Sequence, residues 1–260
     1  MKLTFLGTGT SFGVPQIGCS CAVCRSPDPR DRRSRSGAVV EYDGGTRLLI
    51  DTSPELRLQL LAAGIARVDA VFITHDHADH THGLDDIRAL TPHGAPALPI
   101  YGPAEALEGV VRKFPYVFDG SMQPLPGTSK PEGVARPIEP GTVVHVRDVS
   151  IEAVAVPHGP LRVFGYRIGG LAYVTDAKTV PGAALERLRG ASVLVLNALR
   201  RSPHPTHLSV ADAVAVAAEI GAARTFLTHL THDQSHSQLA AQLPSGIEPA
   251  YDGLEIDVPT

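Results

Sequence analysis

One stretch of the sequence concentrates histidine and carboxylate side chains: Thr74-His75-Asp76-His77-Ala78-Asp79-His80-Thr81-His82-Gly83-Leu84. The apolar, β-branched segment 68–73 before it predicts a buried strand, and the apolar positions 84, 87 and 90 after it predict a helix. The loop between these two rigid elements therefore carries four potential metal ligands: His75, His77, Asp79 and His80. Imidazoles and carboxylates packed this densely are the ligands that zinc and similar divalent ions prefer.

The spacing of these residues suits two ions rather than one. On a tight loop, His75 and His77 can point to one locus, while Asp79 and His80 point to a second. Two ions a few ångströms apart activate a water between them for hydrolysis. The alternative is a surface loop that is rich in histidine by chance. Four ligand-type residues within six make that alternative the weaker interpretation.

The pattern His-x-His-x-Asp-His resembles the signature of the metallo-β-lactamase superfamily of binuclear metallohydrolases. The resemblance implies an α/β fold, a four-layer αββα sandwich, with the metals at one edge between the sheets. It also implies three further ligands, in the order His, Asp, His. The chain offers them at the ends of expected strands: His158, Asp176 and His229.

The resemblance thus implies two divalent metal ions, which could be zinc, manganese or iron. His75, His77 and His158 would hold one ion. Asp79, His80 and His229 would hold the other, with Asp176 as the bridge between them. No residue is assigned to an organic cofactor.

The same resemblance assigns roles to Asp51 and His207. Asp51 ends a buried strand and corresponds to an Asp that orients a metal-bound His. His207 precedes a helix expected over 210–220, with Ser209 as its N-cap. It corresponds to an active-site His that faces the substrate without binding a metal. The remaining histidines are expected to be solvated: His82, His93, His145, His204 and His236.

All three cysteines lie in Cys19-Ser20-Cys21-Ala22-Val23-Cys24. Their odd number argues against disulfides, and thiolates this close can hold one ion with a fourth position left to fill. The loop resembles that of the cyclic phosphodiesterase branch associated with carbon–phosphorus lyase, where a distant His completes a structural zinc site. His232 corresponds to that His. The pyrroloquinoline quinone biosynthesis protein carries a similar loop, and three buried or reactive thiols are the alternative.

The composition describes an ordinary globular protein of 260 residues with 43% hydrophobic residues and a formal net charge of -4. We expect a single domain over 1–260. The charge does not favour a large nucleic-acid footprint, which usually needs a basic face. The start of the chain predicts a strand rather than a signal peptide. We therefore expect a cytoplasmic protein that does not bind membranes.

Three other segments carry weaker signals. The glycine-rich stretch 7–13 is interpreted as a structural turn close to the metals rather than a phosphate cradle. The basic run 30–35 predicts a solvated loop, with room for one arginine near the substrate. The long Pro- and Gly-rich segment 114–136 could form a lid or a homodimer contact, and a partly ordered excursion is an equally good interpretation.

These observations predict a binuclear metal-dependent phosphodiesterase for small molecules. By resemblance its substrates are small cyclic phosphodiesters, such as a phosphoribosyl cyclic phosphate, and His207 would protonate the leaving oxygen. One alternative is hydrolysis of a carboxyl ester, lactone, thioester or β-lactam on the same metals. Another is RNA 3′-end processing, for which the sequence shows no basic arm. A third is a binding or carrier protein in cofactor biosynthesis, like the quinone pathway member.

Overall fold

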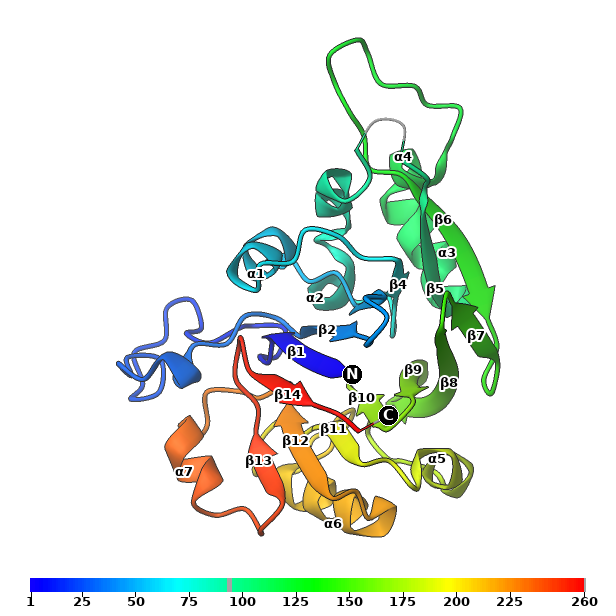
Figure 1. Cartoon of the computed structure of the whole chain (residues 1–260). Coiled ribbons are helices and arrows are strands. Elements are labelled where there is room, and N and C mark those ends of the chain that lie inside the picture. The colour runs from blue at the N-terminus through cyan, green and yellow to red at the C-terminus, as the bar shows by residue number, and fades with distance from the viewer. Residues whose placement is uncertain (93–94, 260) are drawn as a thin grey trace.

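The computed structural model describes residues 1–92 and 95–259, so His93 lies outside the described part of the chain. Its two seven-stranded sheets share one interior (Figure 1). The first sheet has, in spatial order, the strands β14 (Glu255–Asp257), β1 (Lys2–Gly7), β2 (Gly37–Glu41), β3 (Arg47–Ile50), β4 (Ala70–Phe72), β5 (Leu98–Pro103) and β6 (Gly133–Ile138). Strands β3 to β6 are parallel.

The second sheet has the same number of strands and also combines parallel and antiparallel pairs. Its spatial order is β13 (Ile247–Pro249), β12 (Arg224–Thr228), β11 (Val193–Asn197), β10 (Leu171–Val174), β9 (Leu161–Ile168), β8 (Val149–His158) and β7 (Val143–Val146). Strands β10 to β13 are parallel. Strands β8, β10 and β12 therefore end at the same edge of this sheet.

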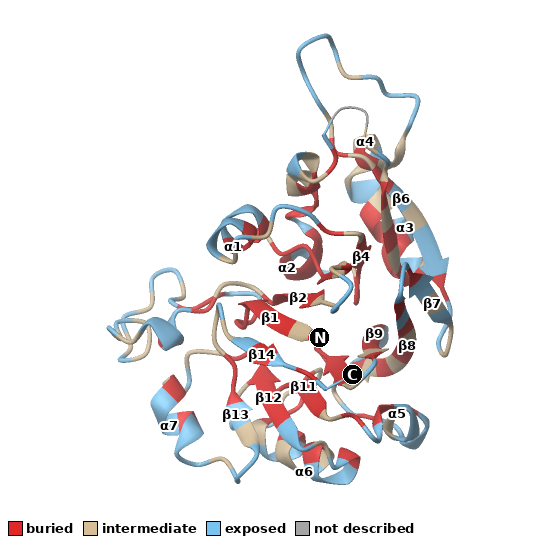
Figure 2. Ribbon diagram, viewed as in Figure 1, coloured by how far each residue is buried: buried red, intermediate tan, exposed pale blue. Residues whose placement is uncertain are grey.

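The main hydrophobic core lies between the sheets, as the buried inner strands show (Figure 2). Side chains along a strand alternate between its faces. In β3, Leu48 and Ile50 accordingly point into this core, whereas Leu49 points outward into a second cluster. Phe226 and Tyr173 fill the core from the opposite sheet. The alternation gives each sheet two apolar faces, so helices must cover the outer ones.

Helices cover the outer face of each sheet. On the first sheet these are α1 (Leu56–Ala62), the 3₁₀ helix η2 (Leu84–Ala89) and α3 (Ala104–Lys113). On the second they are α5 (Gly182–Leu188), α6 (Val210–Ile220) and α7 (His236–Ala240). Three short elements complete the fold: η1 (Pro29–Asp31), α2 (Ala78–Thr81) and α4 (Pro115–Phe118). The predicted four-layer αββα sandwich is thus confirmed. Within the described residues, no helix has the length and apolar character needed to cross a membrane.

The structure corrects several local expectations. The histidine-rich loop is partly helical, because Asp79 and His80 lie in α2. Arg33 is not solvated: its buried guanidinium donates hydrogen bonds to Thr8 Oγ1 at 3.0 Å and to the carbonyl of Ala250 at 2.6 Å. His236 is also buried, at the start of α7. Arg33 and His236 are each held by a segment distant in sequence, because the N–H of His236 donates a 2.6 Å hydrogen bond to Asp31.

Segment 114–136 contains α4 and the start of β6, joined by an exposed loop that projects from the body of the protein (Figure 1). It contacts η2, where Tyr116 donates a 2.9 Å hydrogen bond to Asp85 and Arg88 donates to the carbonyl of Ser129. It also contacts Thr91, whose hydroxyl accepts a 3.1 Å hydrogen bond from the N–H of Glu132. None of its residues lines the cavity at the histidine cluster. The arrangement gives no support to a lid over that cavity.

Candidate metal centre

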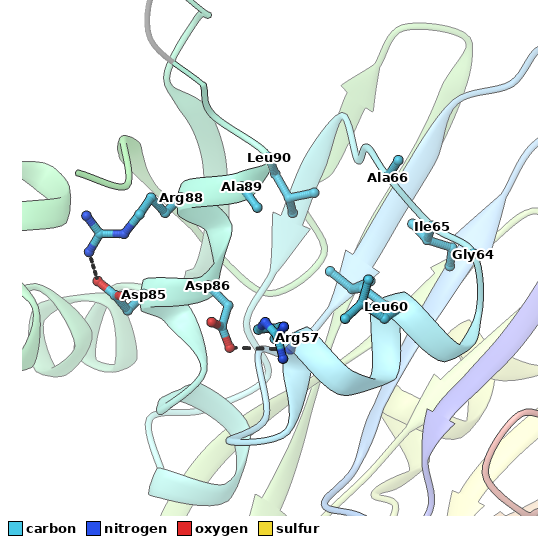
Figure 3. Close-up of a pocket in the computed structure, with 11 residues that line it drawn as sticks. Arg57, Leu60, Gly64, Ile65, Ala66, Asp85, Asp86, Arg88, Ala89 and Leu90 are labelled. Atoms are coloured by element: carbon cyan, nitrogen blue, oxygen red, sulfur yellow. Dashed lines mark hydrogen bonds and ion pairs between the residues drawn. The ribbon is translucent and has the colours of Figure 1, made fainter. Parts of the chain in front are cut away.

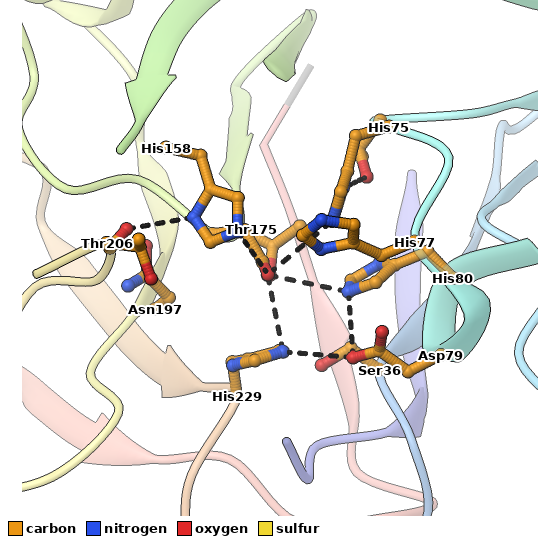
Figure 4. Close-up of polar contacts among 12 residues, drawn as sticks. Ser36, His75, His77, Asp79, His80, His158, Thr175, Asn197, Thr206 and His229 are labelled. Carbon is orange, nitrogen blue, oxygen red and sulfur yellow. Dashed lines mark hydrogen bonds and ion pairs between the residues drawn. The ribbon is translucent and has the colours of Figure 1, made fainter. Parts of the chain in front are cut away.

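The predicted ligands converge where strands of both sheets end, although they come from distant segments of the chain. Figure 4 shows the rings of His75, His77 and His80 on one side, with those of His158 and His229 facing them. The first three follow β4, His158 ends β8 and His229 follows β12. The parallel strands deliver these side chains to a common edge, as the sequence predicted.

Three residues at this edge have left-handed backbone conformations. The φ angles are 61° for Asp51, 57° for Asp176 and 58° for His229. Such conformations cost about 1–3 kcal/mol in non-glycine residues and persist where the surrounding fold fixes them. Asp51 and His229 directly follow a buried strand, and Asp176 lies two residues after the end of β10. The strain thus turns a strand end so that its side chain enters the centre.

The two carboxylate oxygens of Asp176 face different groups of histidines. Oδ2 lies 3.7 Å from Nε2 of His75 and 3.9 Å from Nε2 of His158. Oδ1 lies 3.5 Å from Nε2 of His80 and 3.4 Å from Nε2 of His229. This is the placement that a carboxylate bridging two ions requires.

The first group is completed by His77, whose ring centroid is 4.5 Å from that of His75 and 5.2 Å from that of His158. Asp79 completes the second group: its Oδ2 lies 3.4 Å from Nε2 of His80 and 3.6 Å from Nε2 of His229. The potential ligand atoms of each group lie within 4.8 Å of one another. The structure therefore brings together both predicted sets, in the predicted division.

The donor atoms fit divalent ions. Within the described residues, Nε2 of His75, His80 and His229 is buried without a hydrogen-bond partner. Unpartnered buried polar atoms are unfavourable, and an ion would satisfy them. Zinc binds nitrogen and oxygen ligands at about 2.0–2.2 Å. Two ligand atoms on the same tetrahedral ion are then separated by roughly the nitrogen-to-oxygen distances observed here.

Neighbouring side chains orient the histidines. Nδ1 of His80 donates a 2.7 Å hydrogen bond to Asp51, which also accepts a 2.8 Å bond from the backbone N–H of Thr74. Nδ1 of His158 donates a 2.8 Å bond to the carbonyl of Thr206. Both contacts leave Nε2 directed at the centre. Asp51 therefore occupies the supporting position that the sequence assigned to it.

The imidazoles and carboxylates of the cluster shift one another's pKa values. Burial alone would lower the pKa of His80, but the Asp176 and Asp79 carboxylates raise it well above its usual value. Burial likewise opposes ionisation of Asp176, yet the His229 and His80 rings hold its pKa well below its usual range. Protonation and metal binding therefore compete at His80.

We expect Asp51→Asn to weaken metal binding by about 10–100-fold, because the amide loses the charge that fixes the His80 ring. Calorimetric titration of metal-free protein with Zn²⁺ or Mn²⁺ measures this. Asp257→Asn, an exposed change on β14, is the matched control and should leave the affinity unchanged. Equal affinities for the two variants would show that Asp51 does not support the centre.

His207 lies beside the two predicted metal sites. Its Nε2 is 3.2 Å from Oδ2 of Asp176, and its ring stacks on that of His229 with centroids 5.0 Å apart. Nδ1 of His207 lies 3.1 Å from Nδ1 of His204. His204, which is expected to be solvated, is half-buried and contacts His207. Asp176, His207 and His229 are also close enough to share an ion, so proximity alone does not separate a ligand from a substrate-facing residue.

A cavity of about 320 Å³ opens onto the centre. Besides the candidate ligands and His207, Ser11 of the glycine-rich turn lines it. This turn is tied to the segment after β12, because Leu230 donates a backbone hydrogen bond to Thr8. A Cβ on Gly7 would lie 2.0 Å from the carbonyl of Arg35, so the turn needs glycine there. The turn is structural and close to the histidines, as predicted.

The three cysteines and His232 form a separate cluster. Nδ1 of His232 lies 3.3 Å from Sγ of Cys19 and of Cys24, and 3.4 Å from Sγ of Cys21. A backbone hydrogen bond from Cys24 lowers the pKa of Cys21 to about 6, whereas burial raises the pKa of Cys24 to about 11. Three sulfurs around one imidazole nitrogen match a closed tetrahedral zinc site.

We expect Cys21→Ser to lower the melting temperature and to remove about one zinc equivalent, because this site has no open position for catalysis. Folded variant should keep much of its turnover. Differential scanning calorimetry and elemental analysis measure the two losses. Ser20→Ala, an exposed neighbour, is the control. Normal melting with unchanged zinc in Cys21→Ser would rule out the structural site.

A larger cavity, of about 570 Å³, lies between α1 and η2 (Figure 3). Apolar side chains such as Leu60 and Leu90 form much of its wall, and Asp86 accepts a hydrogen bond from the backbone of Arg57 at 3.3 Å. None of the candidate metal ligands lines it. This cavity is larger than the one at the histidines, but it is not the candidate active site because it contains no candidate metal ligand.

Sequence reasoning missed several supporting residues. Thr206 holds His158 through its backbone carbonyl, and Asn197 fixes the turn after Asp176 by accepting a 2.7 Å hydrogen bond from the N–H of Ala177. Backbone contacts of this kind leave no mark in a sequence. A weaker signal was available: threonine precedes His75, His207 and Asp176, and each of these hydroxyls contacts the side chain that follows.

Comparisons with known proteins agree with this geometry. The family described as Beta-lactamase superfamily domain matches residues 46–230. A crystal structure described as a new diphosphatase from the PhnP family is 40% identical, with a TM-score of 0.90, and the match covers 98% of this chain and 97% of that one. Zn²⁺-bound PqqB from Methylobacterium extorquens has a TM-score of 0.82 at 20% identity, covering 99% and 100%, which shows similarity of fold alone.

An octanoyltransferase of Porphyromonas gingivalis (strain ATCC BAA-308 / W83) is 39% identical over 257 residues, which are 98% of this chain and 51% of that protein. The chain thus spans about half the length of that relative. The matches in sequence and fold, together with the histidine and carboxylate clusters, lead to one assignment. The chain belongs to the metallo-β-lactamase superfamily of metal-dependent hydrolases, near its PhnP family.

Proposed function

We propose that the chain is a binuclear metal-dependent phosphodiesterase that hydrolyses small cyclic phosphodiesters, such as a phosphoribosyl cyclic phosphate. The observation that carries this proposal is the position of Asp176. Its two oxygens face separate histidine groups, while His207 touches the same carboxylate from the cavity. The cavity thus offers two cation sites and a separate proton donor.

The proposed roles follow from these positions. When bound, the ions supply a hydroxide nucleophile at neutral pH and neutralise phosphoryl oxygens. Asp51 orients His80, and the carbonyl of Thr206 orients His158. His207 holds a proton at Nε2 and donates it to the departing oxygen. Burial lowers the pKa of His207, which makes its protonated form a stronger acid.

Phosphoryl chemistry is supported by the similarity to a PhnP-family diphosphatase, which extends over nearly the whole of both chains. The name octanoyltransferase belongs to a protein of twice the length. All three cysteines here lie in the Cys19–Cys24 cluster with His232, so no other thiol is present to carry an acyl group. The similarity to the diphosphatase is our reason for favouring phosphodiesters over carboxyl esters, lactones or thioesters.

A catalyst is also favoured over a binding or carrier protein for cofactor biosynthesis. A carrier needs ligands for its cargo, whereas His207 adds an acid–base group to the proposed ligand set. We further propose a small molecule rather than nucleic acid as substrate, because the net charge is -4. A small substrate also matches the cavity of about 320 Å³.

A substrate panel tests the proposal. Metal-loaded protein should open a five-membered cyclic phosphodiester with many turnovers, and treatment with a chelator should abolish this activity. Nitrophenyl acetate, a lactone and an acyl thioester serve as the competing substrates. Faster turnover of any of these than of the diester would make the protein an ester or thioester hydrolase. Binding without turnover on the whole panel would favour the carrier interpretation.

A further inference from the structure

A second cavity, of about 240 Å³, adjoins the one at the metal centre. The two cavities share Ser11 and His207 as lining residues. From this shared wall, the second cavity extends over Phe12 and Arg200 toward Asp233. His207 therefore stands between the proposed metals and a further space that is large enough for part of a substrate.

The position of His207 indicates which part of the substrate would occupy the second cavity. This step rests on the proposed function, in which His207 protonates the departing oxygen. The phosphorus then lies on the metal side of the ring, and the rest of the leaving alcohol continues past it. The space beyond His207 is the second cavity. Its lining should therefore select among leaving groups.

Phe12 is the first informative side chain of this lining. It is 66% exposed, which is unusual for phenylalanine. The turn that carries it is held by backbone hydrogen bonds: the N–H of Thr10 donates to the carbonyl of Leu230 at 3.3 Å, and the N–H of Gly13 donates to the carbonyl of Thr10 at 2.8 Å. An exposed ring on a fixed turn is a suitable surface for stacking another flat ring.

Arg200 is the second informative side chain. One of its terminal nitrogens donates a 3.3 Å hydrogen bond to the carbonyl of Pro203. Its Nε is buried and has no partner within the part of the chain that the structure describes. Asp233 lines the same cavity. A cavity lined by one guanidinium and one carboxylate suits an uncharged group that accepts a hydrogen bond from Arg200.

We propose that the second cavity is the leaving-group subsite, and that it takes a leaving alcohol bearing a flat, uncharged heterocycle of the nucleobase type. The heterocycle stacks on Phe12, and its carbonyl or ring nitrogen accepts a hydrogen bond from Arg200. Both residues bind the leaving side of the substrate and set its specificity. Neither takes part in the chemical step.

Methylphosphonate monoesters test this proposal, because they carry the single charge of a diester but have one ester bond, so the leaving group is unambiguous. The two substrates are a nucleoside 5′-methylphosphonate and ethyl methylphosphonate. Wild-type protein should have the higher kcat/KM for the nucleoside ester. Stacking of one base on an aromatic side chain is worth roughly tenfold or more. Phe12→Ala should lose about that factor with the nucleoside ester and far less with the ethyl ester.

Matched variants distinguish a loss of leaving-group binding from a general loss of folding or activity. Arg200→Ala should also lose activity selectively with the nucleoside ester, and Phe12→Tyr should retain it. The controls are Ile17→Ala, which is 98% exposed, and Arg201→Ala, whose guanidinium contacts Gln242. Neither control residue lines either cavity. Both controls should match wild type on the two esters.

The outcomes distinguish this inference from the function on which it rests. Equal losses on both esters in Phe12→Ala and Arg200→Ala would overturn the leaving-group subsite. Turnover of both esters without any preference or dependence on Phe12 would overturn it as well, while the phosphodiesterase function would stand. If the metal-loaded protein opens a cyclic phosphodiester but hydrolyses neither ester, the subsite for a separate leaving alcohol is overturned while the phosphodiesterase function stands. Failure on the cyclic phosphodiester as well would overturn the proposed function and the inference with it.

Discussion

Asp176→Ala is expected to lose at least one active-site ion and to lose far more activity than the roughly 10–100-fold that removal of a supporting hydrogen-bond partner costs. The reason is the shared position of this carboxylate. Its oxygens lie 3.7 Å from Nε2 of His75 and 3.4 Å from Nε2 of His229, on opposite sides. Its removal leaves both proposed sites incomplete.

Elemental analysis of the purified variant, together with its rate on a cyclic phosphodiester, measures the two losses. Asp257→Asn is again the control, and it should keep all ions and the full rate. Asp176→Asn adds a more conservative comparison, because the amide keeps the shape but not the charge. Full metal occupancy and full rate in Asp176→Ala would refute the bridge.

His207→Ala is expected to show a second large loss, which depends on the leaving group. An alkoxide departs poorly without a proton, and general acid catalysis typically contributes about 10²–10⁴-fold. The loss should therefore reach that size for an alkyl leaving group and stay small for a nitrophenolate, which departs unaided. Metal content should not change. Steady-state rates on matched alkyl and nitrophenyl diesters measure the difference.

The other possible outcomes assign His207 a different role. Equal losses on both substrates would indicate positioning or electrostatics rather than proton donation. Loss of an ion would make His207 a ligand, a role that its 3.2 Å distance from Asp176 makes worth measuring. Unchanged rates on both diesters would remove it from the mechanism.

The sequence predicted much of the centre, for a simple physical reason. Each ligand follows an apolar strand, so its place at a sheet edge can be inferred from local pattern. The resemblance to the superfamily implied three further ligands in the order His, Asp, His, and the strand ends then indicated His158, Asp176 and His229. The helix at 210–220 was equally local: Ser209 and Asp212 form the capping box that marks its start.

What the sequence did not predict depends on contacts between distant segments. Strand β14 pairs with β1 across nearly the whole chain, with Lys2 opposite Asp257. Arg33 is buried because Ala250 accepts its hydrogen bond. No local periodicity encodes these pairings, because they form only when both sheets are assembled.

The most direct test of the central claim is hydrolysis of a cyclic phosphodiester by metal-loaded protein in ¹⁸O-labelled water. The account predicts one labelled oxygen in each product molecule, bonded to phosphorus, and no label in the released hydroxyl. Label on carbon would contradict attack at phosphorus. Absence of product from protein with both proposed active-site ions bound would contradict the phosphodiesterase function itself.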